Sequence, residues 1–225
     1  MDASTTHAPG GPDVQRRDPT AGTEARDRVA FVPTPIADPG PLGLAAFALT
    51  TFVLSMFNAK LVGSGGEPVV LGLALAYGGL AQFAAGMWEF RTGNTFGAVA
   101  FTSFGAFWLS YWALVQFFAK DIPSADVGHA VGLYLIAWGI FTTYMFVASL
   151  RTTAAVALVF LLLAATFIVL GIGNSGNHEN IVKAGGWLGL ATAAVAWYAS
   201  FAAVTNATFG RVVLPVKPLA RPAAR

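Results

Sequence analysis

Six long stretches without a charged residue determine most of what this chain can fold into. Each is at least 18 residues long, and together they cover residues 42–59, 68–88, 92–119, 127–150, 152–177 and 184–210. An α-helix needs about 20 apolar residues to cross the hydrocarbon core of a bilayer, and a backbone in lipid must satisfy its own hydrogen bonds. Membrane β-strands would be about 10 residues long with alternating polarity, and no such alternation is seen. The pattern predicts an all-α membrane protein with six transmembrane helices.

The shortage of charge also excludes several classes of protein. Charged residues make up 11% of the 225 residues, whereas an ordinary soluble domain carries roughly 25%. A soluble enzyme or a disordered protein is therefore not expected, and the chain should sit in a lipid bilayer. The net charge of +2 is too small to indicate a nucleic-acid partner. The absence of cysteine excludes disulfides and thiolate metal sites.

The basic residues predict which way the chain crosses the membrane. Ten of the 13 lysines and arginines fall in the two ends of the chain and in the loops after the second and fourth spans, and three fall in the other loops. The positive-inside rule then places both termini in the cytoplasm, and the plasma membrane is the expected location. We predict a disordered cytoplasmic tail over residues 1–36, a six-helix transport domain over 37–210 and a C-terminal cytoplasmic tail over 211–225.

Polar residues inside the spans carry no formal charge, which limits the kind of solute that could pass. Most of the serines and threonines should bond back to their own helix carbonyls. Gln82 lies mid-span with a full amide, so it needs either protein partners or a wet cavity. A carrier of permanently charged solutes usually keeps a counter-charge there. A small weak acid that can shed its charge, such as a monocarboxylic acid, fits better.

Glu89 and the aromatic residues each leave two interpretations open. Glu89 ends the second span, where it either pairs with Arg91 or Arg151, which is the expectation, or serves as a proton site. The aromatic residues near span ends should form interfacial belts and fill the core, and a few phenylalanines lining a pathway is the alternative. This aromatic set includes Trp88, Trp108, Trp112, Trp138, Trp187 and Trp197.

No arrangement of residues typical of an enzyme is found. The three histidines lie in the N-terminal segment or at the ends of spans, and no catalytic triad, zinc motif or phosphate-binding loop is present. We therefore expect no enzymatic activity, no metal and no cofactor. The loops are short, so function should reside in the helical bundle.

One stretch near the first span matches a family signature. Residues 38–44, Asp-Pro-Gly-Pro-Leu-Gly-Leu, resemble the Asn-Pro-Ala-Pro-Leu-Gly-Leu motif of the acetate uptake transporter family, also called acetate/succinate–proton symporters. Further matches lie at 47–51, 58–59, 77–82, 89, 93–97, 101–105, 107–108, 171–174, 184–187 and 209–215. The resemblance covers about residues 37–216. In this motif Asp38, Pro39, Pro41 and Gly43 would form the entrance.

The resemblance implies a fold, an activity and a set of site residues. The fold would be a six-helix protomer in a hexameric ring with one pathway per protomer, carrying acetate and also succinate with protons. The apolar constriction would be Phe47, Phe104 and Leu163, and substrate contacts would come from Thr50, Thr51, Gln82 and Phe104. Asn58, Glu89, Asn94 and Asn174 would be proton sites or structural polar sites.

Two departures from the family pattern suggest hypotheses. Asp38 replaces the Asn of the motif, and an ionised aspartate at a mouth should repel an anion, although it caps a helix as well as Asn does. Phe104 stands where the family commonly has Tyr, so the constriction should be drier and favour the protonated acid. Two alternatives remain open: a passive channel for the anion or weak acid, and a sensory membrane protein without net transport.

Overall fold

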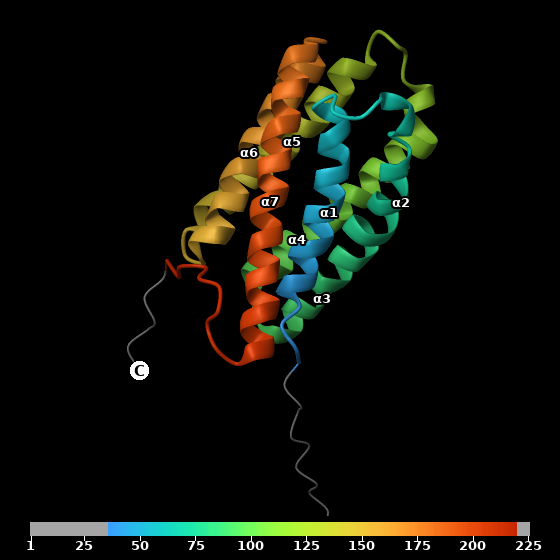
Figure 1. Ribbon diagram of the computed structural model, residues 1–225. Helices are drawn as coiled ribbons and strands as arrows, with labels where there is room; N and C mark the ends of the chain where they lie inside the picture. Colours follow the sequence, from blue (N-terminus) through green and yellow to red (C-terminus); the bar gives the residue numbers. More distant parts are fainter. Residues whose placement is uncertain (1–35, 220–225) are drawn as a thin grey trace, which may run out of the picture. The chain divides into compact units, whose positions relative to one another are not determined.

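The computed structural model describes residues 36–219, and the helical bundle begins at Gly40 (Figure 1). The predicted disordered tail lies outside the described residues except for Ile36, as do residues 220–225. Within the described part, the helices are α1 (Gly40–Asn58), η1 (Ser64–Gly66), α2 (Val69–Leu75), η2 (Ala76–Ala81), α3 (Gln82–Thr92), α4 (Thr95–Ala113), η3 (Leu114–Phe118), η4 (Ala119–Asp121), α5 (Val127–Ser149), α6 (Ala154–Ser175) and α7 (Glu179–Phe209).

These elements form six helices that are long and apolar enough to cross a membrane, which confirms the predicted number of spans. Their bounds are Gly40–Asn58, Ser64–Thr92, Thr95–Asp121, Val127–Ser149, Ala154–Ser175 and Glu179–Phe209. The second span runs past the uncharged stretch to include Glu89 and Arg91, and α7 starts early enough to include Lys183. Charged side chains near a helix end can reach the interface, so charge alone did not mark the helix ends.

The second and third spans each contain a π-helical segment. The first, η2, covers Ala76–Ala81 and ends immediately before Gln82, and the second, η3, covers Leu114–Phe118. Such bulges are rare and occur frequently at functional sites. The bulge at η2 brings Gly78 so close to α1 that an added Cβ would lie 2.6 Å from Thr50 Oγ1. The hydroxyl of Thr50 therefore faces η2.

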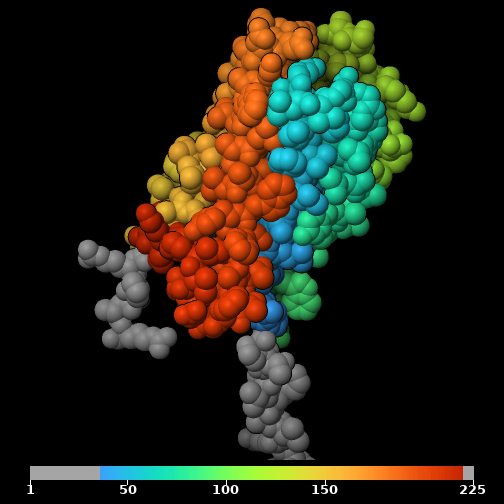
Figure 2. All heavy atoms as spheres, in the orientation of Figure 1, coloured from blue at the N-terminus to red at the C-terminus, as the bar shows by residue number. Residues whose placement is uncertain are grey.

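The helices of the bundle differ in how closely their backbones approach one another. Helix α1 packs against α7, α6 lies between α5 and α7, and α3 pairs with α4. The backbones of α4 and α5 lie farther apart, and these two helices meet through side chains such as Phe107 and Tyr134. Figure 2 shows the atoms of α7 and α1 in contact along one face of the bundle. Along this seam a Cβ on Gly186 or Gly189 would overlap Ala59 or Ser55. These small residues therefore let two helices of one protomer approach closely.

The residues after α7 return to the bundle and cap α6. The amide of Ala154 donates to Lys217 O (2.8 Å), the amide of Leu219 donates to Thr152 O (2.9 Å), and Thr153 and Pro218 form an antiparallel bridge. The hydroxyl of Tyr198 donates to Pro215 O (2.7 Å). We call residues 213–219 the C-terminal strap. The strap is part of the predicted C-terminal tail, and hydrogen bonds hold it to the start of α6 and to α7.

Candidate substrate pathway

Four cavities follow one another through the bundle, and neighbouring cavities share lining residues. The Glu89 vestibule is lined by Asp38, Glu89, Asn94, Thr153 and Phe160 among others, and the Gln82 cavity by Phe47, Gln82, Phe104, Phe160 and Leu163 among others. The Trp108 cavity shares Phe47 and Leu163 with the Gln82 cavity. The Asn174 vestibule shares Asn58 and Phe107 with the Trp108 cavity. The row runs from one end of the helices to the other.

The two ends of this row are wide and its middle is narrow. The Glu89 and Asn174 vestibules have volumes of about 290 and 260 Å³, against about 20 Å³ for the Gln82 cavity and 40 Å³ for the Trp108 cavity. A single water needs roughly 10–15 Å³ measured in this way. The Gln82 cavity therefore has room for one water and none for a carboxylic acid, so the pathway is closed at its centre.

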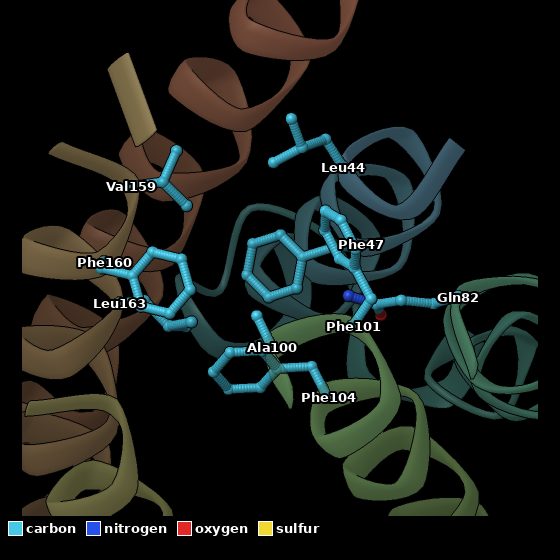
Figure 3. Close-up of a pocket in the computed structure, with 9 residues that line it drawn as sticks. All are labelled: Leu44, Phe47, Gln82, Ala100, Phe101, Phe104, Val159, Phe160 and Leu163. Carbon is cyan, nitrogen blue, oxygen red and sulfur yellow. The ribbon is translucent and has the colours of Figure 1, made fainter. Parts of the chain in front are cut away.

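Phenylalanine and leucine side chains form the closed centre. Figure 3 shows Phe47 of α1 and Phe104 of α4 facing Phe160 and Leu163 of α6. The ring centroids of Phe47 and Phe104 lie 5.9 Å apart, and Phe104 also contacts Phe160 at 5.9 Å. Phe47, Phe104 and Leu163 are 3–4% exposed. The structure thus brings the three residues of the predicted constriction together.

Gln82 lies beside this constriction with an unusual lack of partners. Its side chain is 1% exposed, and its Oε1 atom has no hydrogen-bond partner. Of the two interpretations from the sequence, the structure favours a cavity-facing amide, because Gln82 lines the narrow cavity rather than a polar network within the protein. Its amide is the one polar side-chain group among the residues lining that cavity.

The two threonines predicted to contact substrate have different environments. The hydroxyl of Thr50 donates back to Ala46 O (2.9 Å) and faces η2, so the structure does not bring Thr50 to the pathway. Thr51 lines the Trp108 cavity, and its Oγ1 atom has no partner. Adjacent helical residues point about 100° apart, which explains why only one of the pair reaches the row of cavities.

Four other span threonines behave as the sequence predicted, whereas Thr102 Oγ1 is buried without a partner. Back-bonds to the carbonyl four residues earlier are confirmed at Thr142, Thr143, Thr166 and Thr192. Thr166 and Thr192 also lie 3.3 Å apart, oxygen to oxygen, across the α6–α7 contact. Satisfied hydroxyls of this kind bring little polarity to a pathway. The unsatisfied hydroxyl of Thr51 is an exception.

The prediction that Glu89 forms an ion pair with Arg91 or Arg151 is wrong. Between residues 36 and 219 one salt bridge is present, and it joins Lys60 to Glu179. Residues two apart on a helix do not face each other, so Arg91 points away from Glu89, and both Arg91 and Arg151 are exposed. The carboxylate of Glu89 instead accepts a hydrogen bond from Thr92 Oγ1 (3.1 Å), and its side chain is 2% exposed.

Gly97 makes room for the carboxylate of Glu89. A Cβ on Gly97 would lie 2.6 Å from Glu89 Oε1 and 2.6 Å from Asn94 Nδ2. Asn94 caps α4, because its Oδ1 atom accepts a hydrogen bond from the amide of Gly97 (3.1 Å). Glu89, Asn94 and Gly97 thus form a packed corner of the Glu89 vestibule.

Of the four residues predicted to form the entrance, Asp38 lines the same vestibule. Asp38 Oδ1 accepts a hydrogen bond from the amide of Gly40 (2.9 Å), the first residue of α1, although the N-cap position itself is occupied by Pro39. A Cβ on Gly40 would lie 3.0 Å from Asp38 Oδ1 and 3.4 Å from Glu89 Oε1, so two carboxylates border one point. Pro39 and Gly43 are buried, and Pro41 O accepts from Ser200 Oγ (2.7 Å).

The remaining predicted polar sites lie at the opposite end. Asn58 and Asn174 both line the Asn174 vestibule, and Asn174 Nδ2 donates to Leu170 O (2.8 Å). Tyr134 joins them there, with its hydroxyl bonded to Ser110 Oγ (2.7 Å) and to Phe107 O (3.1 Å). Sequence reasoning missed Tyr134 and the buried Trp108, because aromatic residues near span ends are typical of membrane interfaces.

Comparison with known proteins identifies the family to which this chain belongs. The GPR1/FUN34/yaaH family matches residues 22–221, and the chain belongs to this family. Accumulation of dyads protein 2 of Saccharomyces cerevisiae is 45% identical over 184 residues, which are 78% of this chain and 65% of that protein. The chain thus spans slightly less than two thirds of that relative's length.

A bacterial relative is covered almost completely. The succinate-acetate/proton symporter SatP of Escherichia coli K12 is 39% identical over 183 residues, 81% of this chain and 96% of that protein. The solved structure of the bacterial acetate channel SatP superposes with a TM-score of 0.76 at 38% identity, covering 81% of this chain and 99% of that one. The family resemblance inferred from the motifs is confirmed.

Proposed function

We propose that this chain transports acetate, and with it other short carboxylates such as succinate, across the plasma membrane together with protons. The observation that carries the proposal is the closed apolar centre between two wide vestibules, formed by Phe47, Phe104 and Leu163. The names of the bacterial relatives, a symporter and a channel for acetate, agree with it.

The chemistry of the constriction favours the neutral acid over the anion. Moving a carboxylate into an apolar site costs at least several kcal/mol. Protonating a carboxylic acid of pKa between roughly 4 and 5 at pH 7 costs about 3–4 kcal/mol, at 1.36 kcal/mol per pH unit. The second cost is the smaller one. Acetic acid would therefore carry its proton through the Phe47–Phe104 contact, and the rings must move aside to let it pass.

Assembly and orientation form part of the proposal. We expect a homohexamer in which each protomer has its own pathway, with both termini in the cytoplasm. The row of cavities runs within one protomer, which supports a separate pathway in each copy. Ten basic residues against three support the orientation. Light scattering of the purified protein and protease access to the termini in sealed vesicles would test both.

Uptake of labelled acetate into proteoliposomes tests the main proposal. We expect saturable uptake that rises as the external pH falls, with competition from formate, lactate or succinate and none from ammonium. Empty liposomes measure the passive leak of acetic acid, which must be subtracted. Uptake no faster than this leak at any pH would contradict the proposal.

Two further measurements separate the alternatives. A coupled carrier moves a fixed number of protons per acetate, so the conditions at which its net flux reverses depend on both the pH gradient and the acetate gradient. In a channel for the anion alone, the flux reverses at a membrane potential set by the acetate gradient. A sensory protein would show no net transport. Removing residues 1–36 should leave uptake unchanged if transport resides in residues 37–210.

A further inference from the structure

Two residues that line the Trp108 cavity each carry a buried polar atom without a hydrogen-bond partner. These atoms are the indole nitrogen Nε1 of Trp108 and the hydroxyl oxygen of Thr51. Their side chains are 2% and 6% exposed. Most buried polar groups have a partner, so an exception calls for an explanation such as a bound water, an ion or a functional role. Two exceptions on one 40 Å³ cavity point to something that binds there.

Among the described residues, two other buried side-chain atoms lack a partner, Gln82 Oε1 on the adjoining cavity and Thr102 Oγ1 beside Gly86. Other polar groups near the Trp108 cavity are satisfied. Thr50 and Thr166 bond back to their own helices, and Tyr134 and Ser110 bond to each other. Thr51 has a carbonyl four residues earlier, at Phe47, yet its hydroxyl makes no bond to it. Trp108, moreover, lies in the buried core, which is one of the two places where the sequence predicted aromatic residues.

The two groups have the chemistry of a carboxylate site. An indole N–H can only donate a hydrogen bond, and a threonine hydroxyl can donate one. Among the residues lining the cavity there is no Asp, Glu, Lys or Arg, and the walls around the two groups are mainly Phe47, Phe107, Phe167 and Leu163. A small anion with an apolar end would use the donors and the walls together. An ammonium ion gains nothing from a donor such as Trp108.

We propose that the Trp108 N–H and the Thr51 hydroxyl form a subsite that binds the carboxylate of a short monocarboxylate on the Asn174 side of the constriction. The inference rests on the transport function proposed above and adds a ligand-contacting residue, Trp108. The Gln82 amide lies on the other cavity, and the two cavities share Phe47 and Leu163. A carboxylic acid that leaves the Gln82 amide and crosses the constriction thus meets the Trp108 subsite next, where it can release its proton and bind as the carboxylate.

The size of the cavity sets its selectivity. Its volume is about 40 Å³, roughly three times the minimum for one water, so formate and acetate need the least movement of the walls. Succinate is larger and carries a second carboxylate, for which the lining offers only neutral polar side chains, Ser55, Asn58 and Thr166, and no cation. The subsite should therefore rank formate and acetate above succinate.

Substitution of Trp108 by Phe tests the subsite, because it removes the N–H and keeps an aromatic ring. We expect Trp108→Phe to raise the half-saturating acetate concentration about tenfold, the effect of a hydrogen bond to a charged group. Trp112→Phe is the matched control, since Trp112 lies one turn away on the same helix and lines none of the four cavities. It should leave the half-saturating concentration unchanged. An unchanged value in Trp108→Phe, with only the maximal rate lowered, would overturn the proposal.

Intrinsic fluorescence gives a second readout that does not depend on transport. The chain has six tryptophans, so Trp108→Phe keeps five. Titration of the purified protein with acetate should change the emission of the unaltered protein and of Trp112→Phe, and this change should be absent in Trp108→Phe. If the protein binds acetate in this assay but does not transport it, the transport proposal fails and the subsite stands. Equal titration curves for both variants would refute the subsite whatever the uptake.

Thr51 provides an independent test if Trp108→Phe does not fold. Thr51→Val removes the hydroxyl at nearly the same shape, and Thr51→Ser keeps it. We expect Thr51→Val to weaken acetate binding more than Thr51→Ser, by about threefold to tenfold, while ammonium has no effect on any variant. Equal binding by the Val and Ser variants would count against the subsite.

Discussion

The two vestibules are almost equal in volume and differ in the groups that line them. The Glu89 vestibule is bordered by the carboxylates of Asp38 and Glu89, by the cap of α4 and by the C-terminal strap through Val216. The Asn174 vestibule has the amides of Asn58 and Asn174, two tyrosines and a single carboxylate, Glu67. No lysine or arginine from the described residues lines either one.

This difference indicates that the two mouths treat an anion differently. A carboxylate solute meets the carboxyl groups of Asp38 and Glu89 at the Glu89 vestibule, whereas the Asn174 vestibule offers amide and phenol donors and leads directly to the proposed Trp108 subsite. The centre, where every side chain but Gln82 is apolar, separates the two environments. Each prediction below changes one side or the boundary, and they are ordered by expected effect.

The largest effect is expected from Gly97→Ala, which disturbs the Glu89 vestibule alone. The added Cβ would fall 2.6 Å from Glu89 Oε1 and Asn94 Nδ2, so both side chains must move. We expect overpacking to lower the free energy of unfolding by about 1–3 kcal/mol. We also expect acetate uptake to fall about tenfold, because a rise of about 1.4 kcal/mol in the transport barrier is enough for a factor of ten. Thermal unfolding and proteoliposome uptake measure the two.

Gly72→Ala is the control for this substitution, because nothing lies within 4 Å of its Cβ position. Glu89→Gln, which keeps the size and removes the charge, distinguishes displacement from loss of the carboxylate. If Gly97→Ala transports as well as Gly72→Ala, the packed corner has no role in uptake.

Phe104→Tyr changes the boundary between the two sides. Phe104 is 3% exposed and lies at the centre of the aromatic contacts, 5.4 Å from Phe141 by ring centroids. A hydroxyl there should raise the affinity for acetate about fivefold, the value of one hydrogen bond, and weaken the dependence of uptake on pH, because the anion gains a donor. Phe117→Tyr, at an exposed phenylalanine of η3, is the control. Uptake curves that coincide with those of the unaltered protein at every pH would rule out this role.

Tyr198→Phe loosens the C-terminal strap, which has no counterpart at the Asn174 vestibule. The substitution removes the hydrogen bond to Pro215 O. Because such a bond is worth roughly 0.5–1.5 kcal/mol and this one is partly exposed, we expect hydrogen exchange at Ala154 and Leu219 to speed up about threefold. Tyr144→Phe on α5, an exposed tyrosine, should leave exchange at these two amides unchanged. Equal exchange in the two variants would mean that Tyr198 does not hold the strap.

The smallest effect is expected from Asp38→Asn, because Asp38 is exposed and its charge is screened by salt. Acetate uptake should rise about twofold at low ionic strength, where the Debye length is roughly 30 Å at 0.01 M, and not at 1 M, where it is about 3 Å. Asp126→Asn, just before α5 and outside the four cavities, is the control. The same increase at both salt concentrations would show that Asp38 does not act through its charge.

Local patterns in the sequence were sufficient for the membrane fold. Uncharged stretches predicted all six spans, since the hydrocarbon core excludes charge whatever the packing. Back-bonded threonines such as Thr142 were predictable for the same reason, because the acceptor is in the same helix. The family motifs identified Phe47, Phe104 and Leu163 as a group, although they come from α1, α4 and α6.

Contacts between helices were decided only by the tertiary structure. The sequence could not distinguish Thr50 from Thr51, because which of two adjacent residues faces the pathway depends on the rotation of α1 against η2 and α6. Nor could it show that Glu89 would lie against Gly97 and not beside an arginine, or that Trp108 would be buried with a free N–H. Charge and hydropathy depend on each residue alone, whereas a cavity and an unpaired donor exist only once several helices are in place.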